Sequence, residues 1–138
     1  MAEALCRQLL FQRLNCKDID ELSTMGYNIL SAGTMGLSDA PASEGAIKAC
    51  ASWGMDLTGH RSRALSMSLI QESDLILAME QFHVDTILNL YPDAKAYCVR
   101  LDQQGDIRDP VGQPLSVYQQ CAVQIERAIE KRVSEWVL

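Results

Sequence analysis

A carboxyl group on a short, constrained loop is the feature of this sequence best suited to chemistry. Asp109 lies in the stretch Asp106-Ile107-Arg108-Asp109-Pro110-Val111-Gly112. Pro110 fixes its own φ and disfavours helix at Asp109, while Gly112 allows the chain to turn sharply. A carboxyl group held in this way can exchange a proton with a reacting group beside it. Asp-Pro-x-Gly is also common turn chemistry, so the motif by itself predicts only a turn.

Cysteine is the other reactive residue type in the chain. The odd number of cysteines and the lack of a C-x-x-C pair argue against a disulfide framework. One C-x5-R pattern runs from Cys121 to Arg127, inside a predicted helix and without a glycine. Helical amides are committed to the helix and cannot converge on a phosphate, so we expect Cys121 to be a core residue. The five cysteines are Cys6, Cys16, Cys50, Cys98 and Cys121.

Composition and charge exclude several classes of partner. The chain has 138 residues and a net charge of −6, which suits one domain without a global field for nucleic acid or an anionic membrane. The two histidines, His60 and His83, are far apart, so we expect neither a metal site nor a cofactor. We see no signal peptide and no apolar run of about 18 residues, and we therefore predict a cytoplasmic protein with reduced thiols.

Alternating apolar patterns predict the elements that would position these groups. Because strands alternate with helices, the fold class is α/β with a parallel sheet. The Asp109 loop follows the last strand and precedes the last helix, where open α/β sheets bind ligands. Three strands are fewer than sheets usually have, so a strand is expected to be missing at the front. The predicted strands are residues 27–32, 74–79 and 96–101, and the predicted helices are residues 1–14, 42–53, 64–73, 80–91 and 115–136.

Five stretches follow one another in a recognisable order: residues 1–5, 31–34, 54–63, 74–79 and 106–112, the last followed by Val117-Tyr118. In order and spacing they resemble the low-molecular-weight protein tyrosine phosphatases, a family that also includes bacterial arginine phosphatases and arsenate reductases. The resemblance implies a single domain over residues 1–138, with a three-layer αβα fold. It also implies hydrolysis of phosphorylated proteins through a phosphocysteine intermediate.

The resemblance assigns roles to individual residues. Asp109 matches the family's aspartic acid, which protonates the leaving oxygen and then activates water. Ser31 and His60 match positions that support the phosphate-binding loop through hydrogen bonds. Asp106 is expected to support the turn. The simpler alternatives are a surface-loop histidine at position 60 and a strand-end hydroxyl at position 31.

The substrate is less well indicated than the chemistry. Many family members carry an aromatic residue directly after the Asp-Pro, where it forms a wall of the substrate slot, but this chain has Val111. This departure weakens phosphotyrosine as the inferred substrate and leaves phosphoarginine open. An arsenate reductase would need two further cysteines in one mobile loop. Only Cys98 lies in that half, on a predicted strand, so we rank this activity lower.

The family pattern also contains parts that do not occur in these 138 residues. In the family, a central first strand and a C-x5-R loop ending Arg-Ser-Pro lead into a helix that begins Met-Ala-Glu, as residues 1–3 do here. We therefore expect about 15 residues to be missing, by typical strand and loop lengths, and with them the nucleophilic Cys and the phosphate-binding Arg.

Without these parts we predict that the chain is inactive as it stands. Its origin would be a misplaced start, a deliberate piece, or a pseudophosphatase that acts as a binding or regulatory module. A different doubly wound domain is a weaker alternative. Residues 27–32 and 74–79 should pair directly, or another chain should fill the gap between them. Exposed strand edges should then favour self-association.

Overall fold

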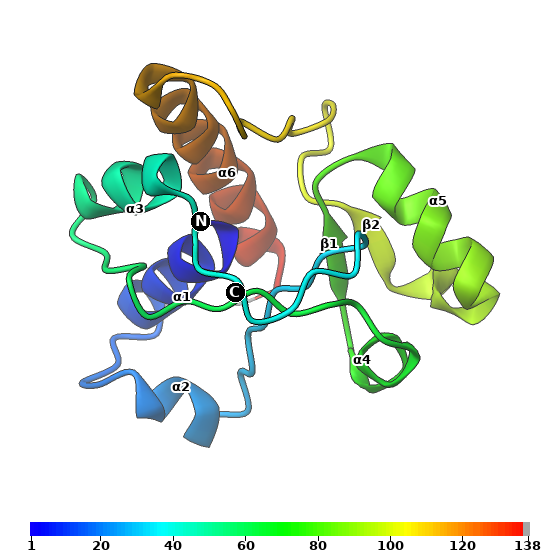
Figure 1. Cartoon of the computed structure of the whole chain (residues 1–138). Coiled ribbons are helices and arrows are strands. Elements are labelled where there is room, and N and C mark those ends of the chain that lie inside the picture. The colour runs from blue at the N-terminus through cyan, green and yellow to red at the C-terminus, as the bar shows by residue number, and fades with distance from the viewer. Residues whose placement is uncertain (137–138) are drawn as a thin grey trace.

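Two short parallel strands lie at the centre of the computed structural model, which describes residues 1–136 (Figure 1). β1 (Ile76–Ala78) pairs in parallel with β2 (Cys98–Arg100), and Leu77 lies opposite Val99. Both strands are shorter than the sequence predicts, but the α/β class with a parallel sheet is confirmed. Residues 137–138 of the predicted domain lie outside the described part of the chain.

Helices account for most of the described chain, and the sequence pattern located five of them to within a few residues. The apolar stripe of residues 115–136 predicted the longest one with its observed bounds. The short helix α2 was not predicted. No helix in residues 1–136 is both long and apolar enough to cross a membrane. The α-helices are α1 (Ala2–Arg13), α2 (Asp20–Thr24), α3 (Glu44–Ala51), α4 (Met67–Glu72), α5 (Gln81–Leu90) and α6 (Leu115–Trp136), and a 3-10 helix, η1 (Pro92–Ala96), precedes β2.

Helices cover both faces of the two-stranded sheet, which gives the three layers that were predicted (Figure 1). Successive side chains of a strand point to opposite faces. Leu77 of β1 therefore packs against the core formed by α1 and α6, while Ala78 belongs to the core formed with α4 and α5. The first core includes Leu5, Leu10, Ile125 and Ile129, and the second includes Ile70, Val84 and Ile87.

The predicted strand at residues 27–32 is wrong. This segment forms no ladder, and beyond its end Gly33 makes one parallel bridge to the segment 63–65. Arg7 of α1 donates a hydrogen bond to the carbonyl oxygen of Ile29 at 2.7 Å. The backbone of residues 27–32 is therefore bonded to a helix side chain, and the expected direct pairing with β1 is wrong. The alternative, that another chain fills the gap, stays a prediction. A missing central strand stays a prediction.

Helix α3 packs closely on the start of α6. The ring of Tyr118, which is 6% exposed, lies directly over Gly45, where an added Cβ would come within 2.4 Å of the ring. The Ser43 hydroxyl donates to the Tyr118 hydroxyl at 3.1 Å. Only a residue without a side chain fits at position 45, so this contact fixes the front end of α6 and, with it, the end of the preceding loop.

Candidate functional site

The loop between β2 and α6 is hydrogen-bonded to the carboxyl end of β1. The Leu101 amide donates to the carbonyl of Ala78 at 2.8 Å, and the Ile107 amide donates to the carbonyl of Met79 at 2.8 Å. Ile107 is 2% exposed and lies in the core between α1 and α6. The loop therefore returns to the sheet just before Asp109, at the edge where parallel sheets bind ligands.

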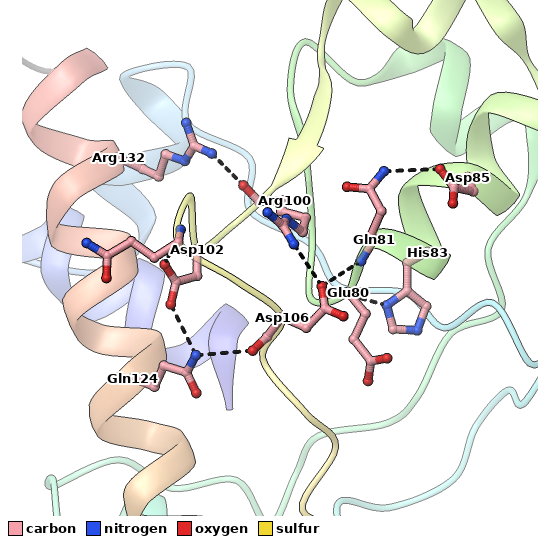
Figure 2. Close-up of polar contacts among 10 residues, drawn as sticks. Glu80, Gln81, His83, Asp85, Arg100, Asp102, Asp106, Gln124 and Arg132 are labelled. Carbon is pink, nitrogen blue, oxygen red and sulfur yellow. Dashed lines mark hydrogen bonds and ion pairs between the residues drawn. The ribbon is translucent and has the colours of Figure 1, made fainter.

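Asp106 ties this loop to the neighbouring helix and strand (Figure 2). Its Oδ1 accepts a hydrogen bond from the amide of Gln81 at 2.9 Å and one from Arg100 at 3.2 Å. Gln81 is the first residue of α5, so the carboxylate satisfies an amide that the helix leaves free. The Gln81 amide and, next, the Arg100 guanidinium lower the pKa of Asp106. Asp106 thus supports the loop.

Asp109 is bound within its own turn. Its Oδ1 accepts a hydrogen bond from the amide of Val111 at 3.0 Å, and the carbonyl of Pro110 accepts one from Gln113 at 2.9 Å. Gly112 has a φ of 77°, which L side chains rarely adopt, so the turn that the sequence predicts depends on glycine there. Asp109 is exposed, and no ion pair within residues 1–136 involves it. Its carboxyl group can therefore reach an external molecule.

An open hollow of about 350 Å³ borders this turn, between the start of α3 and the start of α6. Val111, which lines this hollow, is 64% exposed. Its side chain is aliphatic at the position where an aromatic residue was looked for in the sequence. Lys48 and Glu44 form an ion pair at 2.8 Å, so the α3 side of the hollow carries both signs of charge. The hollow offers space beside the turn that carries Asp109.

Ser31 and His60, the two residues predicted to support a phosphate loop, have different surroundings. The Ser31 hydroxyl donates to Glu3 of α1 at 2.5 Å, and Glu3 also pairs with Arg7 at 2.9 Å. Ser31 therefore lies against the first turn of α1. His60 is half-buried, and its backbone amide donates to the carbonyl of Leu57 at 3.1 Å. No hydrogen bond within residues 1–136 joins Ser31 to His60.

All five cysteines are free thiols, and none resembles an activated nucleophile. Burial raises the pKa of Cys6 to about 11 and also raises the pKa of Cys50 and Cys98, both of which lie in the core. Partial burial, followed by the carboxylates of Glu21 and Asp18, raises the pKa of Cys16. A thiol becomes reactive near neutral pH when its pKa is lowered, and here every shift has the opposite sign.

Cys121 differs from the expectation that it is a core residue. It lies at the edge of the core, partly exposed, on the face of α6 that meets the Asp109 loop. Burial is the main cause that raises its pKa. Residues 121–127 are helical throughout, so their amides form no cradle for a phosphate, as the sequence indicated. The exposure follows from the loop, which covers this position only in part.

Metal ligation has no basis in the described structure. Within residues 1–136, no group of three or more His, Cys, Asp or Glu side chains could hold a metal ion. His83 has a structural partner, since its Nδ1 accepts a hydrogen bond from the amide of Glu80 at the start of α5.

Sequence reasoning missed Gln124, which links α6 to the Asp109 loop. Its Nε2 donates to Asp102 Oδ2 at 3.1 Å and to the carbonyl oxygen of Asp106 at 3.3 Å. A weak signal was present, because Gln124 is a polar residue beside the apolar stripe of α6, between Cys121 and Ala128 at helical spacing. Such a residue near the buried face usually has a specific hydrogen-bonding partner.

Comparison with known proteins gives one consistent result. Residues 1–136 match the model of the low molecular weight phosphotyrosine protein phosphatase family. A probable low molecular weight protein-tyrosine-phosphatase, EpsP, of Ralstonia nicotianae is 31% identical over 132 residues, which cover 94% of this chain and 81% of that protein. A protein-arginine-phosphatase of Geobacillus stearothermophilus is 32% identical over 111 residues, which cover 77% of this chain and 74% of that protein.

Solved structures agree with the sequence relatives. The YwlE arginine phosphatase from Geobacillus stearothermophilus has a TM-score of 0.80 and 27% identity to this chain, and the match covers 97% of this chain and 81% of that one. The fold of residues 1–136 is therefore the fold of these phosphatases.

Proposed function

Because the chain belongs to the low molecular weight phosphotyrosine protein phosphatase family, we propose that Asp109 is the general acid and base of a phosphomonoesterase that acts on phosphorylated proteins. One observation supports this most directly. An exposed aspartate stands on a fixed turn at the carboxyl ends of β1 and β2, where substrate would bind. In the forward step its carboxyl group protonates the leaving oxygen, and in the second step it activates water.

The nucleophile of this chemistry is not one of the five cysteines, in our proposal. The two buried thiols have no route to a substrate, and the helical C-x5-R segment at Cys121 cannot bind a phosphate. These 138 residues would then supply the acid and no attacking thiolate, so they would not hydrolyse phosphomonoesters by themselves. Ser31 and His60 would support the phosphate loop of an active form, a role that stays a prediction.

The substrate class is a phosphorylated protein, with the phosphorylated residue left open between tyrosine and arginine. Relatives named as tyrosine phosphatases and as arginine phosphatases are about equally similar to the chain. The exposed aliphatic side chain of Val111 offers no ring to stack on a phosphotyrosine. The lack of a ring favours phosphoarginine over phosphotyrosine. The Glu44–Lys48 ion pair beside the hollow adds no preference, because its two charges balance.

A binding or regulatory module is the second candidate for the polypeptide as it stands. The raised pKa of every thiol favours it, because a domain that keeps the fold without an activated nucleophile can still dock a partner. In that case, the exposed turn at Asp109 would contact the partner and would carry out no proton transfer.

The two candidates are separated by restoring a nucleophile. A strand and C-x5-R loop from a relative is joined in front of Met1, and hydrolysis of para-nitrophenyl phosphate is measured. We expect turnover that falls about 100- to 10,000-fold in Asp109→Asn, the usual range for a lost general acid. The control is Asp93→Asn, which removes an exposed carboxylate on η1 and should leave the turnover unchanged. A well-folded fusion without turnover, or one indifferent to Asp109→Asn, would refute the proposed role.

A further inference from the structure

Gln124 of α6 holds together two points of the Asp109 loop. Its Nε2 donates to Asp102 Oδ2 at 3.1 Å and to the carbonyl oxygen of Asp106 at 3.3 Å, so one amide group closes the excursion between these residues (Figure 2). Gln124 is half-buried and comes from a helix whose front end is fixed against α3. It therefore connects the loop to a rigid element.

A second contact from the same helix face lies next to the acid. Cys121, one turn before Gln124, approaches the carbonyl oxygen of Arg108 with its Sγ at 3.8 Å. The carbonyls at positions 106 and 108 therefore both face α6, and Asp109 is the next residue along the chain. Thiol hydrogen bonds are weak, so the amide of Gln124 is the stronger of these two links.

The opposite side of the loop is held by the sheet. The amide of Ile107 donates to the carbonyl of Met79, and the carboxylate of Asp106 binds the start of α5. Farther along α6, Arg132 donates to the carbonyl of Leu101 at 3.1 Å, where the loop begins. Residues 106–108 are thus hydrogen-bonded to α6 on one side and to the end of β1 and the start of α5 on the other.

In the described part of the chain Asp109 has no comparable anchor of its own, since the hydrogen bond to its carboxylate comes from within its turn. We propose that Gln124 is a positioning residue, which sets the place and orientation of the Asp109 turn through the carbonyl of Asp106. This rests on the proposed role of Asp109. A general acid must lie within hydrogen-bond reach of its target, and a misplacement of about 1 Å costs about 100-fold in rate.

The test uses the 138-residue chain and needs no substrate. Gln124→Met keeps the length of the side chain and its helix propensity but removes both hydrogen bonds. The matched control is Gln120→Met, an exposed glutamine one turn earlier on α6. Two NMR signals report on the loop: hydrogen exchange of the Ile107 amide and the proton shift of the Val111 amide, which is bonded to Asp109. The exchange of the Ile129 amide, in the buried part of α6, reports on overall stability.

In Gln124→Met we expect the Ile107 amide to exchange about tenfold faster, as for a lost hydrogen bond of ordinary strength. The Val111 amide shift should move upfield towards the value of a free amide, while Ile129 exchange should accelerate by no more than that of Ile107. Gln120→Met should match the wild type in all three signals. Unchanged Ile107 and Val111 signals in Gln124→Met, or equal changes in Gln120→Met, would overturn the proposal.

If Gln124→Met does not fold, Gln124→Asn keeps an amide at this position but is one methylene shorter than the side chain that reaches both acceptors, and it is judged by the same signals and the same outcomes. Failure here is distinguishable from failure of the proposed function. If the fusion with a restored nucleophile hydrolyses its substrate equally fast with and without Asp109→Asn, the acid role is refuted. That result would leave these amide signals unaffected. Unchanged signals would refute the positioning role without bearing on hydrolysis.

Discussion

Asp106 and Asp109 are three residues apart and carry the same chemical group in opposite surroundings. Asp106 is bound by the start of α5 and by Arg100, so its carboxylate holds the loop together. Asp109 is bound within its own turn and is otherwise free to meet a ligand. The same side chain therefore serves structure at one position and, in our proposal, chemistry at the other.

The lowered pKa of Asp106 predicts an acid-dependent contribution to stability. A carboxyl group whose pKa is lower in the folded state stabilises the fold above its ordinary value of 3.8, and this contribution is lost as the pH falls through the lowered value. Asp106→Asn should therefore be less stable than the wild type at neutral pH and should lose less stability on acidification. Urea unfolding at a series of pH values down to 2 measures how the free energy of unfolding of each protein depends on pH.

Some acid sensitivity should remain in Asp106→Asn, because the pKa values of Asp102, Asp56 and Glu44 are also lowered. If the variant loses stability on acidification as steeply as the wild type, Asp106 does not act as described.

Local chemistry explains which site residues the sequence could reveal. Pro110 and Gly112 restrict the backbone by themselves, so the turn at Asp109 could be predicted without knowledge of the fold. Gln124 acts on residues 18 and 22 positions earlier in the chain, and no local rule pairs them. Its partners became visible only when the loop and α6 were placed in space.

At the scale of elements, the contact between α3 and α6 is the tightest feature that a single substitution can test. Gly45→Ala would force a methyl group towards the Tyr118 ring, which cannot easily move because it is buried and hydrogen-bonded to Ser43. We expect overpacking to cost about 1–3 kcal/mol, offset in part by up to about 1 kcal/mol from the better helix propensity of Ala. The free energy of unfolding in urea measures the net loss.

Gly59→Ala is the matched control, because nothing lies within 4 Å of the added methyl group. It should change the free energy of unfolding by less than about 0.5 kcal/mol. A Gly45→Ala variant as stable as the wild type would show that Tyr118 has room to move.

Five of the helices were predictable because each carries its own apolar stripe, as α6 does over its whole length, whereas the five-residue α2 is too short to show one. Strands depend on their neighbours, and this is why residues 27–32 were predicted wrongly. Their β-type composition is real, but Arg7 of α1 binds the carbonyl of Ile29, and the bridge to the segment 63–65 forms beyond their end, at Gly33. The strand predicted at residues 96–101 is also shorter than expected. Its first residue, Ala96, belongs to η1, and β2 begins only at Cys98.

At the scale of the whole molecule, β1 and β2 each have one partner strand within residues 1–136, so the sheet has two open edges. Leu75 and Val99, beside these edges, are both 38% exposed. Unpaired edges with apolar neighbours tend to pair with another chain. We therefore predict concentration-dependent self-association in sedimentation velocity, reduced by Leu75→Lys. A monomer at every accessible concentration would contradict this.

We propose that these 138 residues contain the acid of the phosphatase reaction and that none of their five cysteines is its nucleophile. The most direct test of this central claim is hydrolysis of para-nitrophenyl phosphate by the 138-residue chain itself, with Cys121→Ser and Asp109→Asn measured beside it. We predict no turnover above background for any of the three proteins. Turnover by the wild type that disappears in Cys121→Ser would show that the chain has its own nucleophile and would contradict the claim.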